Sequence, residues 1–473
     1  MSYEIRPDYT QRFLLPPDLE DWVGSDHPAR FIRDFVEALD LEELGFSVRL
    51  SEEGRPNYSS DLLVKVWVYA YYTGVRSTRK LEKACCENVA LIWLTGMNYP
   101  DHNTLWRFFR RYRKELKGIW KKSAKVAFAA GLVGLLLHAV DGTKIVSRSS
   151  KKGAWHRKDL EELLEKIESS IEEMTKEVEV KESLEEMDFR LPDKLEEKQS
   201  RVNKIKEALQ RLDDEELNHM HPDDPDARMM KVGNRIEFAY NAQVVVDEEN
   251  GLILAQDVTT DASDNNQLVK MISEVEENLG EVAEETVADG GYYSGKQLLE
   301  AESRNYGVMV NLGKQRLPDE EFHISEFRYD EERDVCVCPK GKELKFEREK
   351  SNKRKEYTVR VYRCKVWRDC PFHAQCSKDK RGRSIEITPY HQAVFRQQEK
   401  HRDKDKKELL YRRKAIVESV FGHIKWNMGF RRSSFQDMIN VGGQWSLICT
   451  AHNLKKLYKY WVSGNLDLKL LSN

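Results

Sequence analysis

Residues 1–130 carry apolar side chains at helical spacing and show little strand-like alternation. This pattern predicts an all-α N-terminal domain. One helix is expected from a cap at Ser59 or Ser60, through LLVKVWVYAYYT, to Gly74, because serine favours helix starts and glycine favours helix ends.

Two further helices are predicted, in STRKLEKACCEN and in DHNTLWRFFRRYRKEL, the second capped near Asp101 or Asn103. The second helix is rich in arginine. Two interpretations stay open: a helix-turn-helix variant that places its arginines near DNA, and a plain helical bundle whose arginines are solvated. The arginines concerned are Arg107, Arg110, Arg111 and Arg113.

From Leu132 the pattern changes to β-type segments, LVGLLLHAV, FAYNAQVVVD and GLILAQDVTT. The segments that follow predict a helix (SDNNQLVKMISEVEENLG), a strand (ETVAD), a helix (SGKQLLEAESRN), a strand (GVMVNL) and, much later, the helix KKELLYRRKAIVESVFGHIKW. The order βββαβαβα predicts an α/β core of ribonuclease H type, a mixed sheet covered by helices.

Two insertions are expected to interrupt this core. Residues 155–222 are heptad-like and charged, with a break at RLPD, and predict an antiparallel helical hairpin. Residues 314–405 form a basic, cysteine-rich insertion. The predicted divisions are 1–130 (helical domain), 131–154 (first strand of the core), 155–222 (hairpin), 223–313 (core), 314–405 (basic insertion) and 406–473 (C-terminal helix region).

Charge is segregated along the chain, although the net charge is only -3. Residues 157–228 hold 13 Lys and Arg against 24 Asp and Glu, a balance of -11, which leaves +8 for the rest. Residues 340–432 hold 28 Lys and Arg against 12 Asp and Glu, a balance of +16. A basic excess of this size favours nucleic acid as the partner over a merely solvated face.

The N-terminal stretch MSYEIRPDYTQRF has no apolar segment like a signal peptide. The longest apolar run, Val126 to Val140, contains two glycines and is shorter than the roughly 20 residues of a membrane-spanning helix. We therefore expect a cytoplasmic protein with no membrane partner.

The chain has eight cysteines, which in a cytosolic protein favour thiols or metal ligands over disulfides. Cys338, Cys364, Cys370 and Cys376 could ligate a structural zinc ion in a ribbon-like subdomain, with Cys336 as an alternative ligand. Spacings of 25, 5 and 5 intervening residues do not match paired CxxC knuckles, so free reduced thiols remain an equal alternative.

Two aspartates follow apolar, strand-like segments directly. Asp141 lies in HAVDGTKI and Asp289 in VADGGYYSG, and each is expected to end a strand and precede glycine. A carboxylate at such a place can reach a metal ion, and the glycine would leave room for a phosphate backbone. Either aspartate alone would also fit an ordinary Asp-Gly turn.

Glu418 is the third acidic candidate. At about 100° per residue, Tyr411, Lys414, Glu418 and Lys425 fall within roughly 60° of the predicted last helix, beside an apolar stripe of Leu410, Val417, Phe421 and Ile424. Glu418 is thus expected at the margin of the buried face, aimed at Asp141 and Asp289, although a surface ion pair with one of the lysines is the alternative.

Three carboxylates suit two hard divalent cations about 3.5 to 4 Å apart, which promote in-line phosphoryl transfer. Oxygen ligands fit Mg²⁺, with Mn²⁺ as a substitute.

The helix motif has Tyr411, Lys414, Glu418 and Lys425 at the spacing Tyr, two residues, Arg, three residues, Glu, six residues, Lys. With HAVDGTKI, VADGGYYSG and the helical N-terminal stretch, it resembles bacterial insertion-sequence transposases of the DDE type, in the superfamily of the IS-five and IS-eleven-eighty-two groups. The resemblance covers nearly the whole chain. The one departure is lysine for arginine at Lys414, which keeps the charge but not bidentate phosphate recognition.

The resemblance implies a nucleoid-associated bacterial enzyme with Asp141, Asp289 and Glu418 as catalytic metal ligands and Tyr411, Lys414 and Lys425 at the DNA. It would nick the ends of a mobile element and transfer the 3′-hydroxyls to target DNA. The implied partners are double-stranded DNA with terminal inverted repeats and a second copy of the chain. Two alternatives are a catalytically silent DNA-binding descendant and a ribonuclease H-like nuclease that cuts without joining.

Overall fold

The computed structural model describes residues 18–47, 57–182, 193–312, 321–352 and 357–471. Its N-terminal part, through residue 129, is helical as predicted. The elements are η1 (Leu19–Trp22), α1 (Pro28–Glu37), α2 (Ser60–Thr73), α3 (Thr78–Glu87), α4 (Val89–Leu94), α5 (His102–Tyr112) and α6 (Leu116–Ala129).

The helix ends follow the capping residues that the sequence offers. α2 begins after Ser59 and ends at Gly74, whose φ of 85° is the left-handed conformation that glycine adopts without strain. α5 begins after Asp101, whose side chain accepts a hydrogen bond from the backbone N–H of Thr104 at 2.8 Å. Both predicted starts are therefore confirmed.

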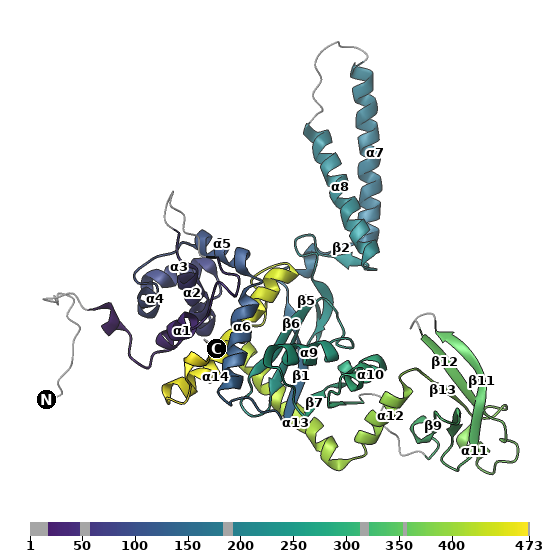
Figure 1. Cartoon of the computed structure of the whole chain (residues 1–473). Helices are drawn as coiled ribbons and strands as arrows, with labels where there is room; N and C mark the ends of the chain where they lie inside the picture. Colours follow the sequence, from purple (N-terminus) through teal and green to yellow (C-terminus); the bar gives the residue numbers. More distant parts are fainter. Residues whose placement is uncertain (1–17, 48–56, 183–192, 313–320, 353–356, 472–473) are drawn as a thin grey trace, which may run out of the picture.

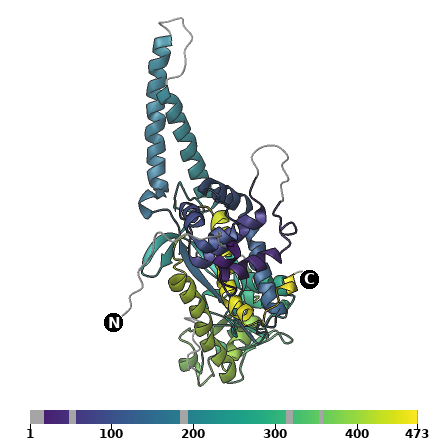
Figure 2. The ribbon, with the colours of Figure 1, turned by 90° about the vertical axis from the view of Figure 1, so that its left-hand side faces the viewer.

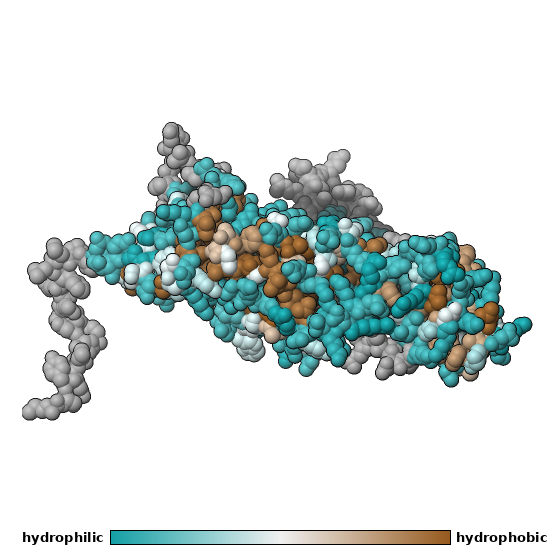
Figure 3. Space-filling view, turned by 60° about the horizontal axis from the view of Figure 1, so that its bottom comes forward, coloured by the Kyte–Doolittle hydropathy of each residue, from teal (hydrophilic) through white to brown (hydrophobic). Residues whose placement is uncertain are grey.

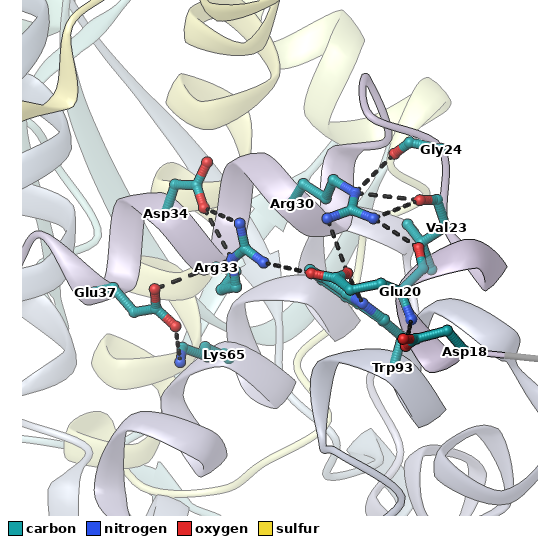
Figure 4. Close-up of polar contacts among 10 residues, drawn as sticks. All are labelled: Asp18, Glu20, Val23, Gly24, Arg30, Arg33, Asp34, Glu37, Lys65 and Trp93. Atoms are coloured by element: carbon teal, nitrogen blue, oxygen red, sulfur yellow. Dashed lines mark hydrogen bonds and ion pairs between the residues drawn. The ribbon is translucent and has the colours of Figure 1, made fainter.

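A network of ion pairs joins η1, α1, α2 and α4 (Figure 4). Glu20 accepts from the Trp93 indole at 2.7 Å and pairs with Arg30 at 3.0 Å, and the Arg30 guanidinium lies 4.8 Å from the centre of the Trp93 ring. Lys65 of α2 pairs with Glu37 of α1 at 2.7 Å. Arg30 and Lys65 are thus already paired with carboxylates, so this network serves the packing of the helices against one another.

A six-stranded mixed sheet forms the centre of the chain, in the order β4-β5-β1-β7-β8, with β6 also paired to β5. β1 pairs antiparallel with β5 and parallel with β7, and β7 pairs parallel with β8. The strands are β1 (Leu137–Val146), β4 (Arg228–Val232), β5 (Arg235–Asp247), β6 (Ile253–Thr259), β7 (Glu285–Ala288) and β8 (Val308–Val310). The mixed α/β architecture agrees with the expectation from sequence, and β4 was not foreseen.

The first strand differs from its predicted bounds. β1 begins at Leu137 instead of Leu132 and continues through Asp141 to Val146, because β5 pairs with it from His138 to Val146. The parallel partner β7 pairs only with residues 137–140. The expectation that Asp141 ends a strand is therefore wrong, although the parallel pairing does end just before it.

Helices from the middle and the C-terminal part of the chain surround this sheet. They are α9 (Leu268–Leu279), α10 (Gly295–Ser303), α12 (His391–Lys400), α13 (Lys404–Gly422), the π-helical turn η5 (His423–Asn427) and α14 (Met438–Val462), with short 3-10 turns at η2 (Lys151–Gly153), η3 (Gly290–Tyr292), η4 (Ile324–Glu326) and η6 (Leu468–Leu471).

α14 was not predicted, and it links the helical region to the sheet. It packs against α2, α6 and β6. The Asn453 amide donates to Ser123 of α6 at 3.2 Å and to the Ile253 carbonyl of β6 at 2.9 Å. One hydrophobic core accordingly runs from the N-terminal helices into the sheet, and it continues across the predicted boundary at residue 130.

α7 (Arg157–Glu182) and α8 (Asp193–Asp214) pack against each other as a long hairpin, above a short ribbon of β2 (Trp155–His156) and β3 (His219–Met220). The hairpin has a small core of its own that includes Leu160 and Leu212. Figures 1 and 2 show that it projects away from the rest of the molecule. Residues 183–192, which contain most of the predicted break at RLPD, lie outside the described residues.

A second, antiparallel sheet lies between β8 and α12 in the chain, in the order β13-β12-β11-β10-β9. It has a separate core that includes Phe327, Tyr362 and Ile385. Its strands are β9 (Arg328–Asp330), β10 (Val335–Val337), β11 (Glu343–Asn352), β12 (Tyr357–Cys364) and β13 (Ser384–Ile387), with the one-turn helix α11 (His373–Cys376) before β13. Figure 1 shows this sheet on the opposite side of the molecule from the N-terminal helices.

The face drawn in Figure 3 is mainly hydrophilic, and most of its apolar residues gather in the middle of the molecule. In the part of the chain that the structure describes, no helix combines the length and the apolar character needed to cross a membrane. The N-terminal residues in which a signal peptide was sought lie outside that part.

Candidate active site

Asp141 lies on β1, and Asp289 directly follows the neighbouring strand β7. β1 and β7 run parallel with Val140 opposite Ala288, so the next residue on each chain segment is an aspartate. This register places the two residues at adjacent positions, and the negative charge of Asp289 contributes to raising the pKa of Asp141. The structure thus brings two of the three predicted carboxylates together.

Asp141 is held by one backbone and one side-chain donor. Its Oδ1 accepts from the N–H of Gly142 at 2.8 Å, and its Oδ2 accepts from Arg413 of α13 at 2.9 Å. Burial raises the pKa of Asp141 to about 6, and the Asp289 charge adds to this effect while Arg413 opposes it. A buried carboxylate beside a second one favours additional positive charge at this edge of the sheet.

Asp289 caps the turn that follows β7. Its Oδ1 accepts from the N–H of Gly291 at 2.8 Å, and the turn η3 leads to Tyr292, whose side chain is fully buried. Burial raises the pKa of the Tyr292 hydroxyl well above its usual value, with further contributions from the charges of Asp264, Asp141 and Asp289. Tyr292 therefore stays protonated and can donate a hydrogen bond.

Sequence reasoning did not single out Asp264, a third aspartate beside this pair. It lies in the loop between β6 and α9, and its Oδ1 accepts from Asn241 at 2.6 Å and from Gln243 at 2.7 Å. It follows a polar loop instead of an apolar strand, so the criterion that found Asp141 and Asp289 could not find it. The buried polar residues Asn241 and Gln243, inside an otherwise apolar strand, were the available signal.

Glu418 does not join the aspartates in this arrangement. Its side chain is 65% exposed and pairs with Lys414 at 3.7 Å, whereas its neighbour Val417 is buried. Within the described ranges, no three His, Cys, Asp or Glu side chains are grouped so that they could hold a metal ion. α13 docks through Val417, Val420 and Phe421, which leaves Glu418 on the outward side. A site of three carboxylates stays a prediction.

Two basic side chains of the C-terminal helix region interact with the charge of Asp141, and Arg413 is the one that forms an ion pair with it. One is Arg413, which sequence reasoning passed over in favour of the adjacent Lys414. The other is Lys425 in the π turn η5, whose pKa is lowered by burial and raised by the charge of Asp141. Tyr411 and Lys414 are exposed by 69% and 72%, on the outward side with Glu418.

The arginines of α5 do not behave as one group. Arg107, Arg110 and Arg111 are exposed, and no ion pair to an acidic side chain is found for them among the described residues. Arg113 is half-buried, and it donates to the carbonyl of Arg110 at 2.6 Å. The first three arginines are available to a ligand.

Arg113 also contributes a close backbone contact with α14. A Cβ added to Gly443 would lie only 2.6 Å from the Arg113 carbonyl oxygen, so the two backbones touch there. This contact belongs to the Arg113 backbone, so a contact of the Arg113 side chain with DNA stays a prediction.

The four cysteines proposed as zinc ligands line one small cavity of about 20 Å³. Cys338 accepts from the N–H of Lys342 at 3.2 Å, and burial raises the pKa of the Cys364 and Cys376 thiols. The alternative ligand Cys336 is fully buried in the core of the second sheet, where burial raises its pKa to about 12.

These thiols share a cavity but do not form a ligand set. No metal-holding group is found in the described residues, which include all four cysteines. The zinc prediction is therefore not supported by their arrangement. These cysteines form no disulfides in the described part of the chain, which agrees with both alternatives, since zinc ligands are not disulfide-bonded either.

Two family models match the chain. The model described as "Transposase DDE domain" matches residues 337–458, which include Glu418 and Lys425. The model described as "Transposase domain (DUF772)" matches residues 17–111, which include most of the N-terminal helices. No curated protein and no solved structure matches the chain.

Proposed function

Because the two family matches identify the chain as an insertion-sequence DDE transposase, we propose that it cuts DNA at the ends of its element and joins the released 3′-hydroxyls to target DNA. A transposase acts on DNA, which agrees with the basic excess in residues 340–432. The terminal inverted repeats of the element are the proposed specific substrate, bound by two copies of the chain.

The pairing of Asp141 with Asp289 carries this proposal. Both follow residues that pair in neighbouring parallel strands at the centre of the sheet, and α13 packs against both strands. The strand order β6-β5-β1-β7-β8, antiparallel over its first three strands and parallel from β1 onwards, supports a ribonuclease H-like core.

The chemistry of Asp141 fits a hard divalent cation. Its carboxylate is buried and lies near a second carboxylate, so a cation with oxygen preference would relieve the repulsion between them. Asp141 and Asp289 would hold Mg²⁺ or Mn²⁺, with Glu418 as the third ligand. When bound, two such ions supply the positive charge that stabilises the attacking and leaving oxygens of phosphoryl transfer.

Glu418 must turn from its present partner to take part. Its ion pair with Lys414 joins two exposed side chains at 3.7 Å, and such surface pairs contribute at most about 1 kcal/mol. The loss of this ion pair is thus inexpensive. Binding of DNA phosphates by Lys414 would release the glutamate at the same time.

The cations near the aspartates have separate proposed tasks. Arg413 orients Asp141 by donating to its Oδ2. Lys425 would contact the phosphate next to the scissile bond, because it lies in the turn that directly follows α13 and its ammonium group interacts with the charge of Asp141. Tyr411 and Lys414, on the exposed side of α13, would contact the DNA backbone farther along.

Other basic residues are proposed to add affinity. Arg107, Arg110 and Arg111 are exposed and free of acidic partners in the described part of the chain, so they can face DNA. In the second sheet, by contrast, Arg360 pairs with Asp334 at 2.8 Å and Arg363 with Glu347 at 2.7 Å. Fewer phosphates are therefore contacted there than the charge count alone suggests.

A strand-transfer assay tests the proposed function. The full chain is incubated with Mg²⁺, a target plasmid and a labelled duplex that carries the element's own end. Joined product supports a transposase, and released 3′ ends without joining would support the nuclease alternative. Specific binding without cleavage, in both Mg²⁺ and Mn²⁺, would support the catalytically silent alternative.

A further inference from the structure

Gly142, which follows Asp141, and Gly291, two residues after Asp289, lie against protein side chains. A Cβ added to Gly142 would lie 2.5 Å from Gln243 Nε2 and 3.1 Å from Asp264 Oδ1. A Cβ added to Gly291 would lie 2.9 Å from Asp289 Oδ1 and 3.4 Å from Asp264 Oδ2. The expectation that these glycines make room for a phosphate is thus wrong for Gly142, whose space is filled from within.

Asp264 is common to both close approaches. Besides the amides of Asn241 and Gln243, its Oδ1 receives Lys144 of β1 at 3.5 Å. Asn241 and Gln243 lie opposite Lys144 and Gly142 in the β1–β5 register and are fully buried. One carboxylate oxygen therefore joins the loop after β6 to β1, the strand that carries Asp141, and to its neighbour β5.

The same network extends to Asp289. The Gln243 amide nitrogen donates to Asp264 Oδ1 and to Asn241 Oδ1, and the Gln243 amide oxygen accepts from the hydroxyl of Tyr292. Asp264 Oδ1 also accepts from the Asn241 amide, so Asp264 fixes, directly and through Asn241, which end of the Gln243 amide faces Tyr292. Tyr292 is the last residue of the turn that Asp289 caps, so the hydrogen bond from Tyr292 to Gln243 also fixes the orientation of that turn.

We infer that Asp264 is a positioning residue, which sets the separation of Asp141 and Asp289 through Gln243 and Tyr292. It acts through the hydrogen bonds of its Oδ1. This inference rests on the proposed function, in which the two aspartates hold a divalent cation. Partners of this kind outside the ligand shell typically change metal affinity by about 10- to 100-fold.

The test compares two substitutions of Asp264 in the full chain. Asp264→Ala removes the acceptor that the Asn241 and Gln243 amides share, whereas Asp264→Asn keeps an acceptor oxygen at the Oδ1 position and loses the charge. Binding of Mn²⁺ to DNA-free protein is followed by electron paramagnetic resonance. We expect binding roughly 10- to 100-fold weaker in Asp264→Ala and near-normal binding in Asp264→Asn. Single-turnover cleavage at saturating DNA should fall in the same order.

Asp261→Ala is the matched control, because Asp261 lies in the same loop but its carboxylate accepts from Gln267 at 2.8 Å. Equal Mn²⁺ binding by Asp264→Ala and Asp261→Ala would overturn the inference. Equal loss in Asp264→Ala and Asp264→Asn would also overturn it, since that result indicates a direct metal ligand or a charge effect.

Tyr292→Phe provides a second variant if Asp264→Ala does not fold. This substitution removes only the hydroxyl that donates to Gln243. It should weaken Mn²⁺ binding, as Asp264→Ala should, and unchanged binding overturns the inference. Wild-type protein that binds Mn²⁺ but cuts no DNA would contradict the proposed function alone, while the comparison of the Asp264 variants remains decisive. Wild-type protein that binds no Mn²⁺ would overturn the inference.

Discussion

Asp141→Asn should make the metal-free protein more stable at neutral and alkaline pH. The fold raises the pKa of Asp141 from 3.8 to about 6, mainly through burial. Its side chain is only 20% exposed, so solvent screening reduces this effect little. A difference of this size corresponds to about 3 kcal/mol of destabilisation once the carboxylate is charged in both states.

The direction of the pH dependence follows from the raised pKa. Well below the unfolded pKa of 3.8, the carboxyl is protonated in both the folded and the unfolded protein, and its burial then causes no pH-dependent loss of stability. As the pH rises, the unfolded chain loses its proton first, so stability is lost progressively until the pH exceeds about 6. Asparagine does not ionise. The stability advantage of Asp141→Asn over wild type should thus grow by about 1.5 kcal/mol between pH 5 and pH 8.

The assay is urea denaturation in EDTA at several pH values, followed by the fluorescence of buried tryptophans such as Trp120 and Trp445. Arg413→Gln is the companion variant, because Arg413 opposes the rise in the pKa of Asp141. It should steepen the loss of stability with pH, and Asp141→Asn should cancel that steepening in the double variant. An Asp141→Asn advantage that is independent of pH, or a loss that grows toward pH 8, would refute the reasoning.

Two further predictions concern the helix region and the second sheet. Glu418→Gln should abolish cleavage and keep DNA binding. It should change the free energy of unfolding by no more than about 0.5 kcal/mol, because the side chain makes only an exposed ion pair. Retained cleavage would mean that Glu418 is not the third ligand. Lys425→Ala should slow single-turnover cleavage at saturating DNA. Replacing the exposed Lys345, Lys365 and Lys378 together should instead mainly flatten the dependence of the logarithm of the DNA-binding constant on the logarithm of the salt concentration. The slope should change by about 0.9 for each phosphate that is no longer neutralised. A Lys425→Ala protein with a changed salt slope and a normal cleavage rate would contradict the placement of Lys425 at the scissile phosphate.

Local patterns in the sequence determined the secondary elements well. The start and stop of α2 at Ser59 and Gly74 depend on capping chemistry within a few residues of each helix end. β7 and β8 are short apolar runs between turn residues, and they formed as predicted. Asp289 was identified for the same reason, since it directly follows the last residue of β7.

Long-range pairing decided what these patterns could not. β1 continues past Asp141 because β5, about a hundred residues later in the chain, supplies hydrogen-bond partners as far as Val146. The single core that joins the N-terminal helices to the sheet depends on α14. α14 is apolar around most of its circumference, so helical periodicity did not mark a face on it.

The same distinction between local sequence patterns and long-range contacts applies to the candidate site. The sequence by itself determined that Asp141 and Asp289 follow apolar segments beside glycine, because that pattern is local. Only the tertiary structure decided that Arg413, and not Lys414, reaches Asp141, and that Asp264 joins the strands around the two aspartates. Both outcomes depend on which side of a helix or loop packs against the sheet, and that choice is made by contacts between segments far apart in the chain.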